Sequence, residues 1–307
     1  MMSFRVFHER LHGIDLEKKD LFLLVKKNNI DQLKILLNNV NPKPNVNVED
    51  QNGITPLMLA AKNGSTDVLQ LLLEAKADTN FKNTKGETAL IWASYTVNLD
   101  CIKALIKANA DVTMQQTDGF DAFRYATEKG DIACMRELLK AGANINKQYN
   151  NGITALIRAA QNGHSDSIDF LLDEKAEVNV QDKDGITALM RASQQGHDYC
   201  VSLLLNAKAN IDLQENFGFT ALMAAAGNDR PQCVKRLINA GAKVHIKDKK
   251  DHSALYYTRD SVCKRLLKEA DPQPGLFSWL FTSKSADNSV VQEDDLSAKV
   301  FLKMNQT

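Results

Sequence analysis

Cysteine and histidine are the residues of this 307-residue chain whose chemistry could support catalysis or metal binding. A series of cysteines is spaced by 33 residues or by twice that number: Cys101, Cys134, Cys200 and Cys233. His197 stands three residues before Cys200, which would allow a Cys–His nucleophile pair. The spacing of the six histidines matches no zinc site, and the chain has neither a His-Glu-x-x-His pattern nor a glycine-rich phosphate loop. The regular interval therefore has to be explained by the elements that carry these residues.

The interval of 33 residues reflects an internal repeat. The tetrapeptide TALI at Thr154 has relatives in the same register at Thr55, Thr88, Asp121, Thr187, Thr220 and Ser253. In the full units a glycine precedes this Thr position by two residues, a short alanine-rich helix follows it, and a second helix carries closely spaced leucines. Threonine is a good N-cap because its hydroxyl accepts a hydrogen bond from an unpaired backbone amide. A helix pair this short cannot bury its apolar face alone, so stacked copies should share one core.

The repeat gives the cysteines a structural explanation. The four regularly spaced cysteines lie thirteen residues after the Thr position, where two other repeats have Val68 and Ser167. A position filled by Val, Ser or Cys selects for small size. Neighbouring helices pack about 8–10 Å apart, beyond the limit of about 7 Å between the Cα atoms of a disulfide. We therefore predict buried, reduced thiols. Five sparse cysteines also favour a reducing compartment.

The unit resembles the ankyrin repeat, on the motif G-x-T-A/P-L, A-A/S, G-H, LL and A-D/N-V-N. The resemblance covers roughly Lys19 to Ala270 and implies an all-α solenoid of stacked helix–turn–helix units with short β-hairpin connections. It also implies that the histidines after the first helix, His164 and His197, form hydrogen bonds within the loops. Neither a catalytic residue nor a cofactor or metal is therefore expected.

The domain organisation follows from the register. We predict an N-terminal segment 1–18, an ankyrin-repeat domain 19–270 made of a cap unit 19–49, six full repeats 50–247 and a cap unit 248–270, and a tail 271–307. The first unit lacks the Thr-x-Leu start, and the loop after it contains three extra residues. The last unit has Asp251 where the others have glycine, so it is interpreted as a truncated cap.

Composition excludes several classes of protein. Lys plus Arg and Asp plus Glu are 38 each, so overall charge does not favour nucleic-acid binding. No apolar run reaches the ~18 residues of a membrane span, and the charged N-terminus does not resemble a signal peptide. We expect a cytoplasmic, monomeric protein whose partner is another protein.

The positions that vary between repeats should carry the function. The fourth residue after the Thr position reads Leu59, Trp92, Tyr125, Arg158, Arg191 and Ala224 along the repeats. Trp, Tyr and Arg are enriched at binding hot spots. We predict a partner-binding surface of Trp92, Tyr95, Tyr125, Arg158, Arg191, Phe120, Phe217 and Phe219. The resemblance places this face in the concave groove, and both arginine side chains are expected to lie largely in water. The partner should be apolar towards the N-terminal half of the groove and acidic towards the middle. Alternatively, Trp92 and Tyr125 pack against neighbouring helices, and Phe217 and Phe219 pack between hairpins.

Several positions depart from the ideal repeat. Lys76, Asn109, Lys175 and Lys208 stand at the end of the second helix, where other repeats have Gly142 and Gly241. If this position is left-handed, each lysine costs up to ~1 kcal/mol relative to glycine. Val97 and Asp229 likewise replace a glycine that ends the first helix. These departures predict a softer stack than an ideal one.

The tail carries two further features. The segment LFSWLF, residues 276–281, either covers the last repeat or docks on a partner or a membrane surface. An acidic cluster, Glu293, Asp294 and Asp295, resembles the C-terminal signals of type IV secreted bacterial effectors, among which ankyrin proteins are frequent. This resemblance implies secretion into the host cytosol, whereas the alternative is an ordinary acidic tail.

The functional hypothesis is a non-enzymatic scaffold that holds a partner protein in its groove. The alternatives are a self-associating adaptor, or a targeting module that delivers a partner enzyme or a membrane-docking tail. The 37 residues after Ala270 are too few for a catalytic domain of their own.

Overall fold

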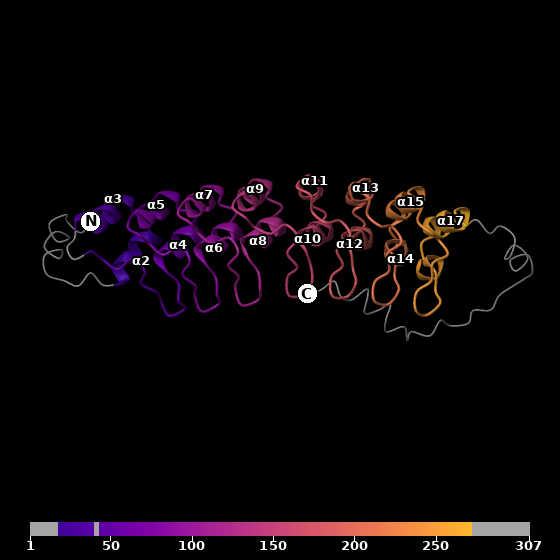
Figure 1. Cartoon of the computed structure of the whole chain (residues 1–307), viewed down its shortest axis with the longest axis horizontal. Coiled ribbons are helices and arrows are strands. Elements are labelled where there is room, and N and C mark those ends of the chain that lie inside the picture. Colours follow the sequence, from indigo (N-terminus) through magenta and orange to yellow (C-terminus); the bar gives the residue numbers. More distant parts are fainter. Residues whose placement is uncertain (1–17, 40–42, 272–307) are drawn as a thin grey trace, which may run out of the picture. The chain divides into compact units, whose positions relative to one another are not determined.

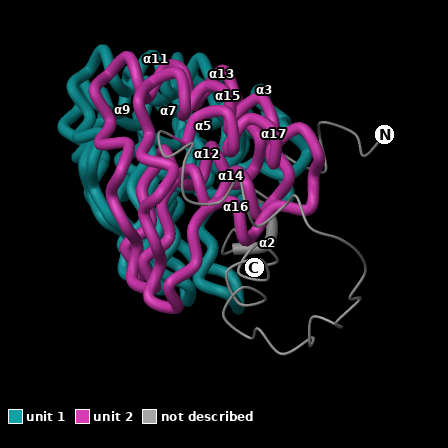
Figure 2. Tube along the Cα trace, turned by 90° about the vertical axis from the view of Figure 1, so that its right-hand side faces the viewer, with its two compact units in different colours: residues 1–183 teal, residues 184–307 magenta. Residues whose placement is uncertain are grey.

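The computed structural model describes residues 18–39 and 43–271 (Figure 1). The LFSWLF segment and the acidic cluster lie outside the described residues. The chain divides into two compact units, Met1–Lys183 and Asp184–Thr307, which Figure 2 distinguishes by colour. The division falls close to Asp182, the predicted start of the fifth repeat.

Short helices make up each unit, and the described residues contain no β-strand. The first unit contains α2 (Lys18–Lys26), α3 (Ile30–Asn39), α4 (Pro56–Asn63), α5 (Thr66–Glu74), α6 (Ala89–Tyr95), α7 (Leu99–Lys107), α8 (Ala122–Lys129), α9 (Ile132–Lys140), α10 (Ala155–Asn162) and α11 (Ser165–Asp173). The second unit contains α12 (Ala188–Gln195), α13 (Asp198–Asn206), α14 (Ala221–Gly227), α15 (Pro231–Asn239), α16 (Ala254–Tyr257) and α17 (Ser261–Glu269). The prediction of an all-α fold built from helix pairs is confirmed.

The helices of each unit pack in two rows. In the first unit α2, α4, α6, α8 and α10 contact one another in succession, and so do α3, α5, α7, α9 and α11 (Figure 1). In the second unit the rows are α12, α14 and α16, and α13, α15 and α17. Each pair also contacts its own partner helix across the rows, as α6 does with α7. Stacking of this kind buries a face that no single pair could bury.

The Thr position begins the first helix of each full repeat, as predicted. Thr55, Thr88, Thr154, Thr187 and Thr220 each accept a hydrogen bond from the backbone amide three residues later. Asp121 accepts the equivalent bond from the amide of Arg124 at 2.9 Å. Such caps stabilise a helix by about 1 kcal/mol. In the truncated cap, Ser253 forms no such bond, and α16 is only four residues long.

The second helix ends in a left-handed residue even where glycine is absent. Lys76, Asn109, Lys175 and Lys208 have φ of 67°, 63°, 67° and 65°. Val97 and Asp229, which replace the glycine after the first helix, have φ of 50° and 52°. The sequence-based expectation of strained positions is therefore confirmed, because side chains other than glycine occupy left-handed backbone only at a cost.

The hairpin-like connections are joined by hydrogen bonds within each unit. The amides of Thr84 and Thr117 donate to the carbonyls of Asn52 and Lys85 at 3.1 Å and 2.9 Å. Glycine is required where the hairpins approach: a Cβ on Gly152 would lie 2.7 Å from the amide nitrogen of Lys183. These bonds fix the position of each hairpin-like connection relative to the next one, and therefore the position of the side chains that it presents.

Candidate functional site

Four aromatic rings of the first unit form a continuous surface row, here named the aromatic patch: Trp92, Tyr95, Phe120 and Tyr125. Trp92 and Tyr95 come from successive turns of α6, Tyr125 comes from α8, and Phe120 precedes α8. The ring centroids are 6.3 Å apart for Trp92 and Tyr95, and 5.5 Å apart for Tyr95 and Tyr125. Phe120 and Tyr125 are 6.1 Å apart, and all three pairs are edge-to-face. Such contacts hold the rings in fixed orientations.

The patch is packed internally and remains open to solvent. Tyr95 is 48% exposed, and the other three rings are partly exposed. The predicted alternative, that Trp92 and Tyr125 pack against neighbouring helices, therefore describes only part of their surface. Burial raises the pKa of Tyr125, whose hydroxyl donates to Oε1 of Gln116 at 3.3 Å. The Nε1 atom of Trp92 is buried without a hydrogen-bond partner.

Cationic groups lie over the rings. The Nζ atom of Lys62 is 4.5 Å from the centroid of Trp92, and that of Lys129 is 5.0 Å from the centroid of Tyr95. The guanidinium carbon of Arg124 is 3.7 Å from the centroid of Phe120. Cation–π contacts of this kind are worth about 0.5–2 kcal/mol, depending on how far they are desolvated. The patch therefore presents apolar area with positive charge beside it.

Behind the patch lies a buried polar cluster. The carboxylate of Asp121 is 2.6 Å from Nζ of Lys147, and it accepts a hydrogen bond from the Tyr149 hydroxyl at 2.9 Å. Tyr149 also extends the row of rings, with its centroid 6.4 Å from that of Phe120. Burial, reinforced by the neighbouring Asp121 carboxylate, holds the pKa of Tyr149 well above its usual range. The phenol is therefore neutral and serves as a hydrogen-bond donor.

The two predicted arginines do not behave alike. Arg158 is partly exposed, and its Nη1 donates to Oε1 of Gln161 at 3.1 Å. Arg191, in the second unit, is only 5% exposed, so the expectation that its side chain lies largely in water is wrong. The burial is shared by its helix, because every residue of α12 from 188 to 194 is buried and α12 contacts α14 in the same row. Exchanging Arg191 for glutamate would therefore disturb folding as well as any binding.

The hairpin phenylalanines of the second unit also differ from each other. Phe219 is 5% exposed, and its ring centroid is 4.8 Å from that of Tyr257. Phe219 therefore packs against helix α16 of the cap unit, rather than between hairpins as in the alternative, and little of it is open to a partner. Phe217 is 47% exposed and stays a predicted contact residue.

The structure reveals one residue of the site that the sequence reading passed over. Arg124 is only 4% exposed, and its guanidinium carbon lies 3.7 Å from the ring centroid of Phe120 and 5.2 Å from that of Tyr149. It stands three residues after the Thr position, where the other full repeats have Met58, Ile91, Ile157, Met190 and Met223. A single charged residue at a position that is apolar in the other full repeats was the signal in the sequence that could have indicated its role.

The cysteines are structural, as predicted. All five are free and buried. Burial raises the pKa of Cys134 and Cys233 to about 12, and that of Cys200 and Cys263 to about 11. These thiols stay protonated near neutral pH, so none is an activated nucleophile. The part of the chain that the structure describes also holds no group of three His, Cys, Asp or Glu side chains that could bind a metal.

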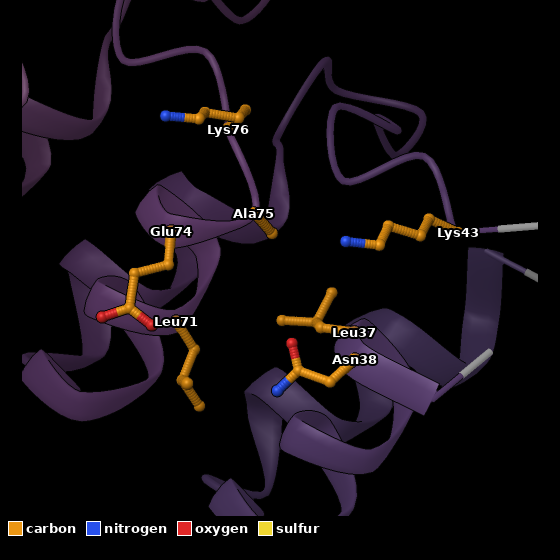
Figure 3. A pocket seen from close by; sticks show the side chains of 7 residues that line it. All are labelled: Leu37, Asn38, Lys43, Leu71, Glu74, Ala75 and Lys76. Atoms are coloured by element: carbon orange, nitrogen blue, oxygen red, sulfur yellow. The ribbon is translucent and has the colours of Figure 1, made fainter. Parts of the chain in front are cut away.

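A shallow hollow lies elsewhere in the first unit, between α3 and α5 (Figure 3). Its volume is about 310 Å³, and it is lined by Leu37, Asn38, Lys43, Leu71, Glu74, Ala75 and Lys76. The lining combines two leucines with charges of both signs and shares no residue with the aromatic patch. It lacks a convergent set of polar groups that would orient a ligand.

The repeat register, the capped helix pairs and the two-row packing are matched by a known family. The family model described as "Ankyrin repeats (3 copies)" matches residues 21–116, 97–182, 123–215 and 189–275. The chain belongs to the ankyrin repeat family. Ankyrin repeat domains generally mediate protein–protein interaction, and ankyrin repeat proteins are typically non-enzymatic binding modules.

Solved ankyrin structures resemble this chain in fold. The human ASB11 ankyrin repeat domain matches with a TM-score of 0.66 and 24% identity, over 72% of this chain and 100% of that one. The ankyrin repeat domain of Bcl-3, a member of the IkappaB protein family, matches with a TM-score of 0.65 and 25% identity, over 71% of this chain and 100% of that one. No curated protein matches the chain. Among the described residues, no helix has the length and apolar character needed to cross a membrane.

Proposed function

We propose that this ankyrin-repeat chain is a scaffold that binds a partner protein through the aromatic patch. The observation that carries the proposal is the continuous row of four rings across two adjacent repeats, one of them 48% exposed. Aromatic side chains dominate interface energetics because they bury large areas with few rotatable bonds. The edge-to-face contacts already orient these rings, which lowers the entropy cost of binding.

The position of the patch supports the same proposal. Its rings come from the first helices α6 and α8 and from the connection before α8, which are the elements that line the groove in ankyrin repeats. Lys62 and Lys129 add positive charge at the Trp92 and Tyr95 rings, and neither forms an ion pair within the described residues. Glu87 and Glu128 lie near the Tyr125 hydroxyl. The partner should therefore bring apolar side chains to the rings and an acidic group to the cations.

The test compares matched variants of the full chain. Proteins captured from the native cytosol are quantified for the wild type, for Tyr95→Ala and for Tyr199→Ala. Tyr199 lies on α13, is 60% exposed and belongs to no part of the patch, so its removal controls for the loss of an exposed tyrosine. The expected result is a partner that is retained by the wild type and by Tyr199→Ala and is lost with Tyr95→Ala.

Two outcomes contradict the proposal. Equal capture by all three proteins would show that the partner binds elsewhere on the chain. Light scattering that reports a dimer, which Tyr95→Ala converts into a monomer, would favour the self-associating adaptor. Thermal melting of each variant guards against a loss of binding that merely reflects unfolding.

A further inference from the structure

Arg124 stands at a position where the repeat fold does not require a charged residue. Its counterparts in other full repeats, among them Ile91 and Ile157 on either side, are apolar and at most 3% exposed. Arg124 is itself only 4% exposed. A buried charge is costly unless it is paired, so an arginine kept in an apolar column calls for an explanation other than packing.

No acidic group within the described residues neutralises this arginine. The adjacent carboxylate, that of Asp121, is already occupied by Lys147 and by the Tyr149 hydroxyl. The Nε and Nη1 atoms of Arg124 are buried without a hydrogen-bond partner. Only Nη2, of the three guanidinium nitrogens, is not shut off from solvent. The guanidinium therefore lies against the rings of Phe120 and Tyr149, and its Nε and Nη1 donors make no hydrogen bond.

We propose that Arg124 is the specificity residue of the aromatic patch and pairs with the carboxylate of an acidic side chain of the partner protein. This inference rests on the proposed function of the patch. Guanidinium and carboxylate form short, charge-assisted hydrogen bonds. Such a bond is stronger in a desolvated site than in water, and the rings of Phe120 and Tyr149 provide that environment.

The exposed rings of the patch lie on the Phe120 side of Arg124, because Tyr149 is only 5% exposed. A segment of the partner can therefore cover these rings with apolar residues while an acidic side chain of the same segment reaches Arg124. Peptides whose C-terminus is an amide separate this acidic side chain from a free chain end.

The experiment selects linear peptides from a random display library on the full chain, with acidic peptides then synthesised as C-terminal amides. Each is compared with the peptide in which its Asp or Glu is replaced by Asn or Gln. The protein variants are Arg124→Met, which restores the apolar residue of the column, and Arg136→Met as the matched control. Arg136 also lies over an aromatic ring, 4.8 Å from the centroid of Phe170, but on α9 and with 49% of its side chain exposed.

The selected peptides should carry an acidic residue, and its replacement should weaken binding to the wild type at least about 30-fold, as expected for a desolvated charge pair. Arg124→Met should bind the acidic peptide as weakly as the wild type binds the neutral one. The neutral replacement should then have little further effect, and Arg136→Met should bind like the wild type.

Each other outcome overturns the inference in a recognisable way. Enriched peptides without acidic residues, or an acidic residue whose effect is the same on Arg124→Met, would remove Arg124 from the site and leave the patch intact. Binding that needs a free C-terminus would assign the carboxylate to a chain end instead. Peptides that bind equally well to Tyr95→Ala, or the absence of enrichment on the wild type, would show that the aromatic patch is not the binding surface.

Discussion

Replacing the left-handed lysines at the ends of second helices by glycine should stabilise the protein. Lys76 and Lys175, both in the first unit, have φ of 67°. Left-handed backbone brings Cβ too close to the following carbonyl oxygen, whereas glycine has no Cβ. Gly142 occupies the same position in another repeat with φ of 99°.

The magnitude follows from three opposing effects. Relief of the left-handed strain is worth about 1–2 kcal/mol per residue. Glycine loses more backbone entropy on folding, which costs about 0.5–1 kcal/mol. A lysine at a helix C-terminus contributes about 0.3–1 kcal/mol through the helix dipole, and salt screens that contribution. At high salt each substitution should therefore raise the free energy of unfolding by about 0.5–1 kcal/mol. Two whole repeats separate the sites, so the effects should add.

The assay is urea unfolding followed by circular dichroism at high salt, for both single variants and for the double variant. Gly142→Lys is the reverse control, because a Cβ there would meet no atom within 4 Å and its cost would be conformational alone. It should destabilise the protein by about 1 kcal/mol. A lower midpoint for the lysine-to-glycine variants, or a neutral Gly142→Lys, would refute the reasoning.

Other predictions follow from the core, the patch and the tail. Cys134 and Cys200 should resist thiol reagents near neutral pH, and rapid stoichiometric labelling without denaturant would contradict their burial. Trp92→Ala should cost about 2 kcal/mol or more of partner binding with at most a small drop in melting temperature, since the ring is only partly packed; a large drop in that temperature would make the ring part of the core. Arg124→Met should raise stability by about 1–3 kcal/mol in urea unfolding, because the removal of two unsatisfied nitrogens outweighs the loss of two cation–π contacts; lower stability would show that the charge supports the fold. Deleting residues 276–307 should leave the circular dichroism of the helices nearly unchanged, because repeat contacts are local. If the acidic cluster is a secretion signal, the same deletion should abolish translocation by a bacterium with a type IV system, and normal translocation would reject the signal.

The fold could be predicted from the sequence because each repeat restates the same local rules. The Thr154 hydroxyl caps its helix as expected, and Gly163 adopts the left-handed conformation that ends the helix. The cysteine column was predicted to be buried from its exchange with Val68 and Ser167, and it is. Periodicity makes such inferences robust, because an error at one repeat is corrected by the others.

The candidate site was harder to predict because exposure depends on the neighbouring repeat. Arg191 shares a position with the partly exposed Arg158, yet it lies buried together with the residues around it on α12. The contact of Phe120 with Tyr125 joins a loop to a helix, and periodicity says nothing about that distance. Arg124 could not be assigned to the site from periodicity, because the other full repeats have Met or Ile at its position, which is typical of the core. A single charge at such a position is what sets this repeat apart.

The low reactivity of the native thiols makes this chain convenient for site-specific covalent labelling. Because all five cysteines are buried and free, a single cysteine introduced on the surface would be the only one that a maleimide reaches quickly. Lys85 lies exposed in the connection before α6, close in sequence to the helix that carries Trp92. A photoactivatable crosslinker attached there would leave the aromatic rings untouched. It would trap a short-lived complex that washing steps remove, and the crosslinked residue of the partner could then be read by mass spectrometry.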